Sequence, residues 1–222
     1  MSWGGNEPET VRHNRLNYLE KLGLDWELAI GADQVHGDQI FRAERHHGGA
    51  GFLEARGRIP ATDGLITQEP GIILTTLHAD CAPIFYADSA RRAIGVAHAG
   101  WRGIYAGLPG KMLQEIERQF GSTGREIRIS VGPMIGADHY EVTPELAGQF
   151  EARFGPEVVM KRAGGLHLDL FATLVVNLLE AGLDADRIPA RPPCTYENPD
   201  YASYRRDGPP ARSMIAWLTI SS

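Results

Sequence analysis

The sequence predicts a single domain that combines β-strands and α-helices. With 222 residues, of which 43% are hydrophobic, the chain can bury one sizeable core. Short apolar runs bounded by Gly and Pro predict strands over 40–44, 71–78, 93–97 and 127–131, and a last strand near the C-terminal end. Apolar residues at helical spacing predict helices over 9–24, over 108–120, after the Thr143-Pro144 cap, and up to Gly182.

Residues 61–78 have the pattern of a β-hairpin. A DG turn at Asp63 precedes a short apolar strand, and an EPG turn at 69–71 precedes a second strand that ends at His78. Side chains alternate along a strand, so His78 and Asp80 share a face unless the strand has already ended. Pro83 favours such a break.

The strands over 71–78 and 93–97 both run into clusters of polar and aromatic side chains: His78, Asp80 and Cys81 after the first, and His98, Trp101 and Arg102 after the second. A strand end beside a helix start directs side chains and free backbone N–H groups at one point, which is typical of ligand sites. Arg102 in a glycine turn indicates phosphate or carboxylate binding. Cys81 fits either a buried apolar position or a reactive one.

Composition restricts the classes of partner. Lys and Arg total 22 against 28 Asp and Glu, and this net charge of −6 predicts no broad basic surface for nucleic acid, so we expect a small-molecule substrate. Two distant cysteines give no disulfide framework, and neither a basic leader nor an apolar run of roughly 18 residues is present. We therefore expect a cytoplasmic protein without a membrane segment, either a monomer or a homodimer.

Three further positions leave alternatives open on the residues alone. His36 beside Gly37 fits a turn or a ligand, and His139 fits a surface turn or a metal ligand. Arg205 and Arg206, next to Asp207, fit a solvated ion pair or the wall of an anion pocket.

Six motifs occur in the order found in a known family: QVHG at 34–37, DGLIT at 63–67, ADCAPI at 79–84, GVAHAGWRG at 95–103, GPMIG with YEV at 132–142, and CTY with SYRRDG at 194–208. The chain resembles the YfiH family, also called peptidoglycan editing factors or multicopper polyphenol oxidoreductase (laccase) domain proteins. The resemblance implies one domain over 1–222, with two facing mixed β-sheets between helical layers. It also implies that the usual N-terminal strand is missing, because residues 3–6 resemble only the end of that region.

The resemblance further implies one zinc ion bound by His36, Cys81 and His98, with a fourth position left for water or substrate. Copper is the alternative metal. The implied activities are phosphorolysis of adenosine, inosine and methylthioadenosine, and deamination of adenosine, so purine nucleoside and phosphate are the expected partners. Asp80 is then the nearest carboxylate in sequence for proton transfer.

Phosphate needs a cationic partner, and substrate binding needs polar side chains near the metal. We expect Arg102 to act in catalysis by binding phosphate, with Arg205 and Arg206 as further candidates for the substrate site. His78 adds a polar group beside the metal and is a third candidate for substrate binding.

Other classes of function remain open. A cysteine hydrolase that pairs Cys81 with a histidine is possible because the fold resembles that of deamidating toxins, and a peptidoglycan-precursor editing enzyme agrees with one name of the family. A non-catalytic nucleotide-binding protein is the alternative without enzyme activity. Metal content separates these classes, and a laccase requires several copper sites whereas the sequence assembles only one convincing ligand set.

Overall fold

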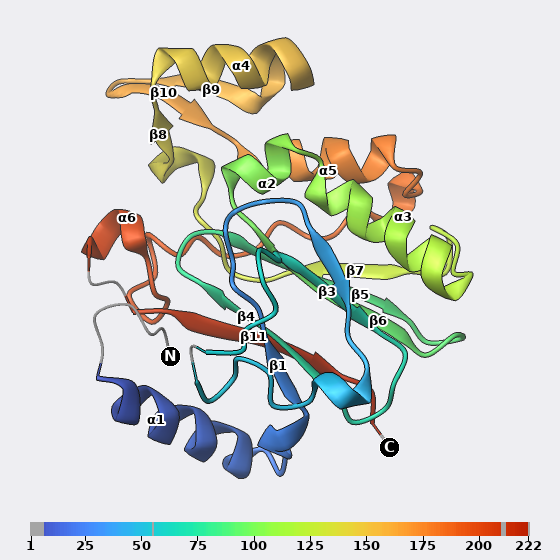
Figure 1. Cartoon of the computed structure of the whole chain (residues 1–222). Coiled ribbons are helices and arrows are strands. Elements are labelled where there is room, and N and C mark those ends of the chain that lie inside the picture. Colours follow the sequence, from blue (N-terminus) through green and yellow to red (C-terminus); the bar gives the residue numbers. More distant parts are fainter. Residues whose placement is uncertain (1–6, 55, 210–211, 222) are drawn as a thin grey trace.

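Two β-sheets face each other at the centre of the structure, a computed structural model that describes residues 7–54, 56–209 and 212–221 (Figure 1). The smaller sheet has the order β1-β4-β11, with β1 parallel and β11 antiparallel to β4. Its strands are β1 (Ala29–Gly31), β4 (Ile73–His78) and β11 (Met214–Thr219).

The larger sheet has the order β2-β3-β6-β5-β7. Only the β2 and β3 pair is parallel, and the other pairs are antiparallel. Its strands are β2 (Ile40–Arg42), β3 (Gly64–Thr67), β6 (Ala93–Ala99), β5 (Ala82–Asp88) and β7 (Arg128–Val131).

Helices cover the outer faces of both sheets (Figure 1). α1 (Pro8–Lys21) shares a hydrophobic cluster with the smaller sheet through Leu19 and Ile73. α2 (Trp101–Tyr105) and α3 (Leu108–Phe120) lie on the larger sheet, and α5 (Leu170–Glu180) packs against these two helices. α6 (Tyr204–Asp207) is a single turn. A peripheral antiparallel sheet carries α4 (Pro144–Phe154) and has the order β8 (Glu141–Val142), β10 (Gly165–Leu168) and β9 (Val159–Arg162).

The apolar residues alternate as this layering requires. Leu65 of β3 and Leu74 of β4 fill the space between the two sheets, whereas Ile66 points to the helices. Both strands therefore have buried side chains on both faces. The predicted fold class, an α/β domain with two facing mixed sheets between helical layers, is confirmed.

The predicted hairpin over 61–78 is wrong, because β3 and β4 belong to different sheets. The EPG turn carries the chain from one sheet to the other, which lets both strands be buried on both faces. β4 ends at His78, where the sequence predicts the end of that strand, and β5, which the sequence did not predict, begins at Ala82.

The helix over 108–120 and the Thr143 cap are confirmed, since the Thr143 hydroxyl accepts the N–H of Leu146. The strand predicted over 127–131 is buried on one face, where Ile127 and Val131 join the core, whereas Arg128 and Ser130 are exposed on the other face. Residues 3–6 lie outside the described residues. Within the described ranges, no helix combines the length and apolarity needed to cross a bilayer.

Candidate active site

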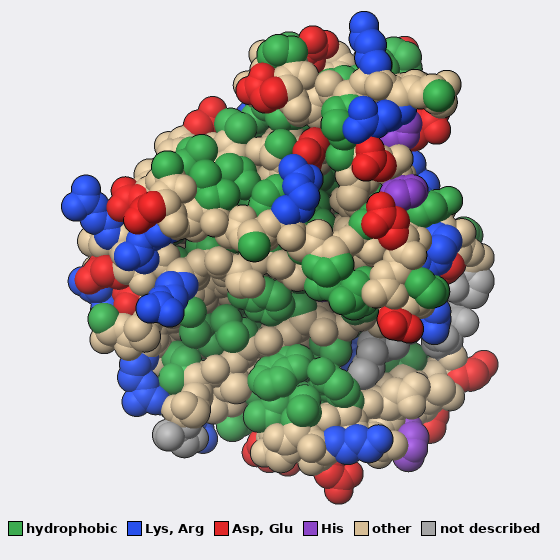
Figure 2. Space-filling model, turned by 180° about the vertical axis from the view of Figure 1, so that it is seen from behind, with side chains coloured by type: hydrophobic (Ala, Val, Ile, Leu, Met, Phe, Trp, Pro, Cys, Tyr) green, Lys and Arg blue, Asp and Glu red, His purple; other side chains and the backbone are tan. Residues whose placement is uncertain are grey.

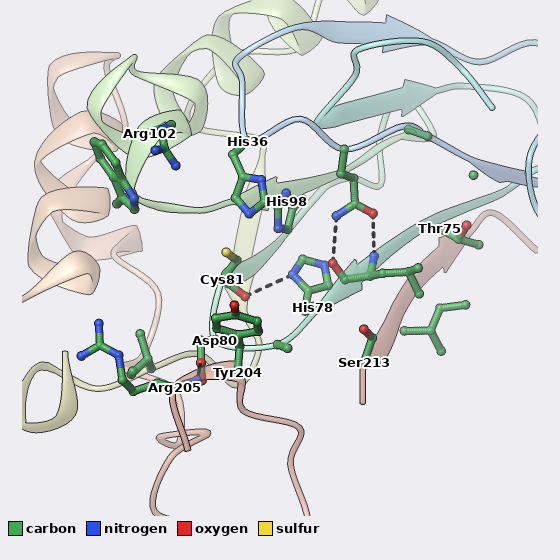
Figure 3. A pocket seen from close by; sticks show the side chains of 18 of the residues that line it. His36, Thr75, His78, Asp80, Cys81, His98, Arg102, Tyr204, Arg205 and Ser213 are labelled. Carbon is green, nitrogen blue, oxygen red and sulfur yellow. Dashed lines mark hydrogen bonds between the residues drawn. The ribbon is translucent and has the colours of Figure 1, made fainter. Parts of the chain in front are cut away.

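A cavity of about 1190 Å³ opens where the chain leaves β4 and β6. His36, Cys81 and His98 lie in its wall and point toward one another (Figure 3). The site is therefore built from three separate segments: the turn before β2, the loop between β4 and β5, and the last part of β6.

The three side chains each offer one possible ligand atom, and these atoms all lie within 4.8 Å of one another. The His36 and His98 rings meet edge to face with their centroids 4.8 Å apart. Gly100 makes this approach possible, because a Cβ there would lie 2.9 Å from His36 Cδ2 and 3.0 Å from Cys81 Sγ. Two imidazoles and one thiol around a common point form a donor set typical of zinc.

Asp63 organises two of these three residues from behind. Its fully buried carboxylate accepts the backbone N–H groups of Val35 (3.2 Å), His36 (3.1 Å) and Gly37 (2.7 Å). The same carboxylate lies 2.8 Å from His98 Nδ1. A carboxylate accepts at neutral pH, so His98 Nδ1 carries a hydrogen and Nε2 remains for the site.

This network also explains the backbone of the QVHG turn. His36 has φ +61°, a left-handed conformation that is costly for a residue with a Cβ. Three N–H donors converging on the Asp63 carboxylate offset that cost. The DG motif predicted only a turn, but its aspartate, Asp63, holds His36 in position.

The protonation states of Cys81 and His98 are coupled. Burial alone raises the pKa of the Cys81 thiol, but the nearby His98 and His36 outweigh burial and lower that pKa from 9.0 to about 6. Burial lowers the pKa of His98, but the Cys81 thiolate and the Asp63 carboxylate outweigh burial and raise it from 6.5 to about 9. Without a metal the pair is a thiolate and an imidazolium at neutral pH.

Residues 2–220 match the sequence model of a family described as multi-copper polyphenol oxidoreductase laccase. The chain belongs to this family. The match spans all of the motifs from QVHG to SYRRDG.

Relatives of this laccase-domain chain carry a different functional name. It is 30% identical to a purine nucleoside phosphorylase, YlmD, of Geobacillus stearothermophilus, over 96% of this chain and 80% of the relative. It is 35% identical to a purine nucleoside phosphorylase of Deinococcus radiodurans, over 97% of this chain and 78% of the relative.

Solved structures of the family have the same fold. YlmD of Geobacillus stearothermophilus superposes with a TM-score of 0.94 at 28% identity, over 100% of this chain and 84% of that chain. The hypothetical protein YfiH of Bacillus licheniformis superposes with a TM-score of 0.93 at 26% identity, over 100% of this chain and 85% of that chain.

His78 lines the cavity of this laccase-domain protein, but both ring nitrogens are engaged. Nδ1 lies 3.1 Å from the carbonyl oxygen of Cys81, and Nε2 lies 2.8 Å from the hydroxyl of Thr76. A carbonyl can only accept, so Nδ1 donates to it and Nε2 accepts from Thr76. Burial and the nearby His98 hold the pKa of His78 well below its ordinary value. The neutral His78 ring therefore holds the loop that carries Cys81 in place. This positioning role differs from the expected role of His78 in substrate binding.

Asp80 also faces the cavity with its oxygens engaged. One oxygen accepts the Thr195 hydroxyl (2.6 Å), and the other accepts the backbone N–H of Arg205 (2.7 Å). Asp80 has φ +84°, so the alternation expected along a strand does not apply to it. Its contacts hold the first turn of α6 against the loop that carries Cys81.

The predicted cations separate into two groups. Arg102 and Arg205 line the cavity. The Arg102 guanidinium lies 4.3 Å from the ring centroid of Trp101, and the Arg205 guanidinium lies 5.0 Å from the ring centroid of Tyr140. Nη1 of Arg205 also donates to the carbonyl of Glu141 at 3.0 Å. Among the described residues, no carboxylate forms an ion pair with Arg102.

The contacts of Arg206 favour a role different from the expected one in substrate binding. Its guanidinium pairs with the Asp207 carboxylate at 2.8 and 2.9 Å and donates to four backbone carbonyl groups. Those acceptors are the carbonyls of Thr195, Tyr196, Asn198 and Tyr201. Arg206 does not line the cavity, and it fastens the segment before α6 instead.

A second group of possible metal ligands corrects the expectation of a single set. His139, Cys194 and Glu197 offer ligand atoms within 4.8 Å of one another.

On the face in Figure 2, the described Lys and Arg side chains lie scattered among acidic ones and form no continuous basic surface.

Proposed function

We propose that this chain is a zinc-dependent purine nucleoside phosphorylase that also deaminates adenosine. The observation that carries the proposal is the convergence of His36, Cys81 and His98 on the wall of a large cavity. Membership of a family with relatives named purine nucleoside phosphorylase supports the choice of reaction.

The residues fit zinc. The fit rests on the low pKa of the Cys81 thiol, which presents a thiolate near neutral pH, and on the His98 tautomer that Asp63 imposes. Three protein ligands leave one position for a reactant, as in catalytic zinc sites. When bound there, zinc supplies Lewis acidity beside the substrate.

Arg102 and Arg205 are suited to hold phosphate. Phosphorolysis places a phosphate oxygen on the sugar carbon while the bond to the purine breaks, so a positively charged wall orients the nucleophile. Arg205 is fixed by its bond to the Glu141 carbonyl and by Asp80, which accepts its backbone N–H. We assign Asp80 this positioning role and not proton transfer, because both of its oxygens already accept hydrogen bonds.

Aromatic side chains supply a place for the purine. Trp101 and Tyr204 line the cavity, and purines stack on aromatic rings. Tyr140 also lines it, and burial together with the nearby Cys81 raises the pKa of its hydroxyl to about 12. Tyr140 therefore keeps its proton at neutral pH and can donate a hydrogen bond to the leaving base.

The test measures products from adenosine, inosine and methylthioadenosine by chromatography, with and without phosphate. We expect free base only with phosphate, and inosine from adenosine without it. His98→Ala should lower both rates by roughly a hundredfold or more, because it removes a ligand. His46→Ala is the matched control, since His46 is exposed in the short 3-10 helix η2 (Arg45–His47), outside the cavity. Equal rates in His98→Ala and wild type would refute the proposal.

A second candidate, a thiol hydrolase, is favoured by one specific observation. The Cys81 thiolate lies beside His98, and His98 Nδ1 bonds to Asp63 at 2.8 Å, which is the arrangement of a cysteine, histidine and aspartate triad. Under this hypothesis, chelator-treated protein hydrolyses amide substrates such as peptidoglycan precursors, and zinc inhibits it. Under the phosphorylase proposal, zinc restores activity to the same sample. Binding of adenosine without turnover under either condition would favour the non-catalytic alternative.

A further inference from the structure

His139, Cys194 and Glu197 form a compact cluster that the proposed reaction does not use. None of the three lines the larger cavity. His139 ends the short 3-10 helix η3 (Ala137–His139), and the other two lie in the segment before α6. An isolated bridge joins the two segments, with Thr195 N–H donating to the Met134 carbonyl at 3.0 Å.

The spacing of the donor atoms matches tetrahedral zinc. Cys194 Sγ lies 3.7 Å from His139 Nδ1, and Nδ1 lies 3.4 Å from a carboxylate oxygen of Glu197. Zinc bonds of about 2.3 Å to sulfur and about 2.0 Å to nitrogen or oxygen place such donors about 3.5 and 3.3 Å apart. Both separations are thus close to those of a bound ion. Glu197 has a side chain that is 60% exposed, so it can turn toward the sulfur.

The surroundings hold the sulfur and the imidazole in place. Cys194 Sγ accepts the backbone N–H of Gly136 at 3.1 Å, a contact that fixes the position of the sulfur. Glycine favours this contact, because a Cβ at Gly136 would lie 3.2 Å from both Cβ and Sγ of Cys194 and would crowd them. The His139 ring stacks on Tyr196, with the planes 18° apart and the centroids 4.4 Å apart.

The arginines of the adjoining cavity are neutralised by carboxylates. A smaller cavity of about 430 Å³ adjoins the cluster and is lined by Cys194 and Glu197. Its two arginines are paired, Arg162 with Asp138 and Arg191 with Asp169. The cavity has room for water or a further ligand at a fourth coordination position.

We propose that His139, Cys194 and Glu197 form a second site for a divalent cation of the zinc type, distinct from the site of His36, Cys81 and His98. An ion there ties η3 to the segment before α6. Thr195, next to Cys194, donates to Asp80, and Arg205 follows in α6. The second ion therefore stiffens the segment that presents Arg205 to the larger cavity.

Zinc counting by equilibrium dialysis of chelator-treated protein tests this site. We expect two zinc ions per wild-type chain, one in Cys81→Ala, one in Cys194→Ala and none in the double variant. His46→Ala is the matched control and should keep two, because His46 is exposed and lines neither cavity. Binding of no zinc by Cys81→Ala, or of an unchanged number by Cys194→Ala, would overturn the proposal. Failure of the first site alone instead leaves one ion in wild type and none in Cys194→Ala.

A measurement on wild-type protein covers the case in which a variant fails to fold. Alkylation of each cysteine is followed by peptide mass spectrometry, with and without saturating zinc. We expect zinc to slow alkylation of Cys194 at least tenfold, as a metal-bound thiolate is protected. An unchanged Cys194 rate, with zinc bound and Cys81 protected, would show that the cluster holds no ion.

Discussion

Replacing Asp63 by Asn perturbs the residue on which the geometry of the site depends. One oxygen of Asp63 accepts from the backbone of Val35 and Gly37, and the other accepts from His36 N–H and His98 Nδ1. An asparagine has one oxygen and one NH₂ group, so either orientation leaves two buried donors facing another donor.

Two unpaired buried donors cost about 2 to 6 kcal/mol together. In a chain of this size that loss lowers Tm by roughly 4 to 24 °C. Since His98 also loses the group that fixes its tautomer, zinc affinity should fall about 10- to 100-fold.

Thermal unfolding and zinc competition titration, on the same samples, measure these two effects. Asp88→Asn is the matched control, because Asp88 is an equally buried carboxylate that accepts two backbone N–H groups at the other end of β5. The control should lose stability but keep its zinc affinity. If Asp63→Asn kept the wild-type affinity within twofold, Asp63 would have no part in placing the ligands.

Three further predictions concern the same site. Gly100→Ala replaces none of the three ligand residues, but the added Cβ would lie 2.9 Å from His36 Cδ2. Zinc affinity measured by competition should therefore fall about tenfold or more. An unchanged affinity would contradict the packing described. In metal-free protein, alkylation of Cys81 should have its midpoint near pH 6, because the thiolate is present above its lowered pKa of about 6 and is lost as the pH falls through that value. His98→Ala removes the neighbour that contributes most to lowering the pKa of Cys81, so the midpoint should move upward; a midpoint near 9 in the wild type would show that the pair is not coupled. Arg102→Ala should raise the KM for phosphate by roughly tenfold or more, with a smaller change for the nucleoside, and steady-state kinetics with each substrate varied in turn measures the two.

The sequence predicted the elements with strong local signals. The helix over 108–120 has the same limits in the structure, because its apolar spacing and its flanking glycines are unambiguous. The hairpin over 61–78 was mistaken, because a turn between two apolar strands does not specify whether they pair or separate into facing sheets. That choice depends on β6, which is distant in sequence and takes the place beside β3.

Some residues of the candidate site were likewise predicted from the sequence, and others were not. His36, Cys81 and His98 were named from their motifs, and the fold brings their ligand atoms together. Asp63 was missed, because its DG context is that of an ordinary turn and only the folded chain shows which donors it meets. The contacts of Arg206 were not predicted, since a sequence does not reveal that backbone carbonyls occupy a guanidinium.

Anomalous X-ray diffraction at the zinc edge, from crystals of the zinc-loaded protein, tests most directly whether the three side chains share one ion. The expected result is a peak about 2.3 Å from Cys81 Sγ and about 2.0 Å from a ring nitrogen of both His36 and His98. Zinc-loaded crystals with no peak between these three residues would contradict the account.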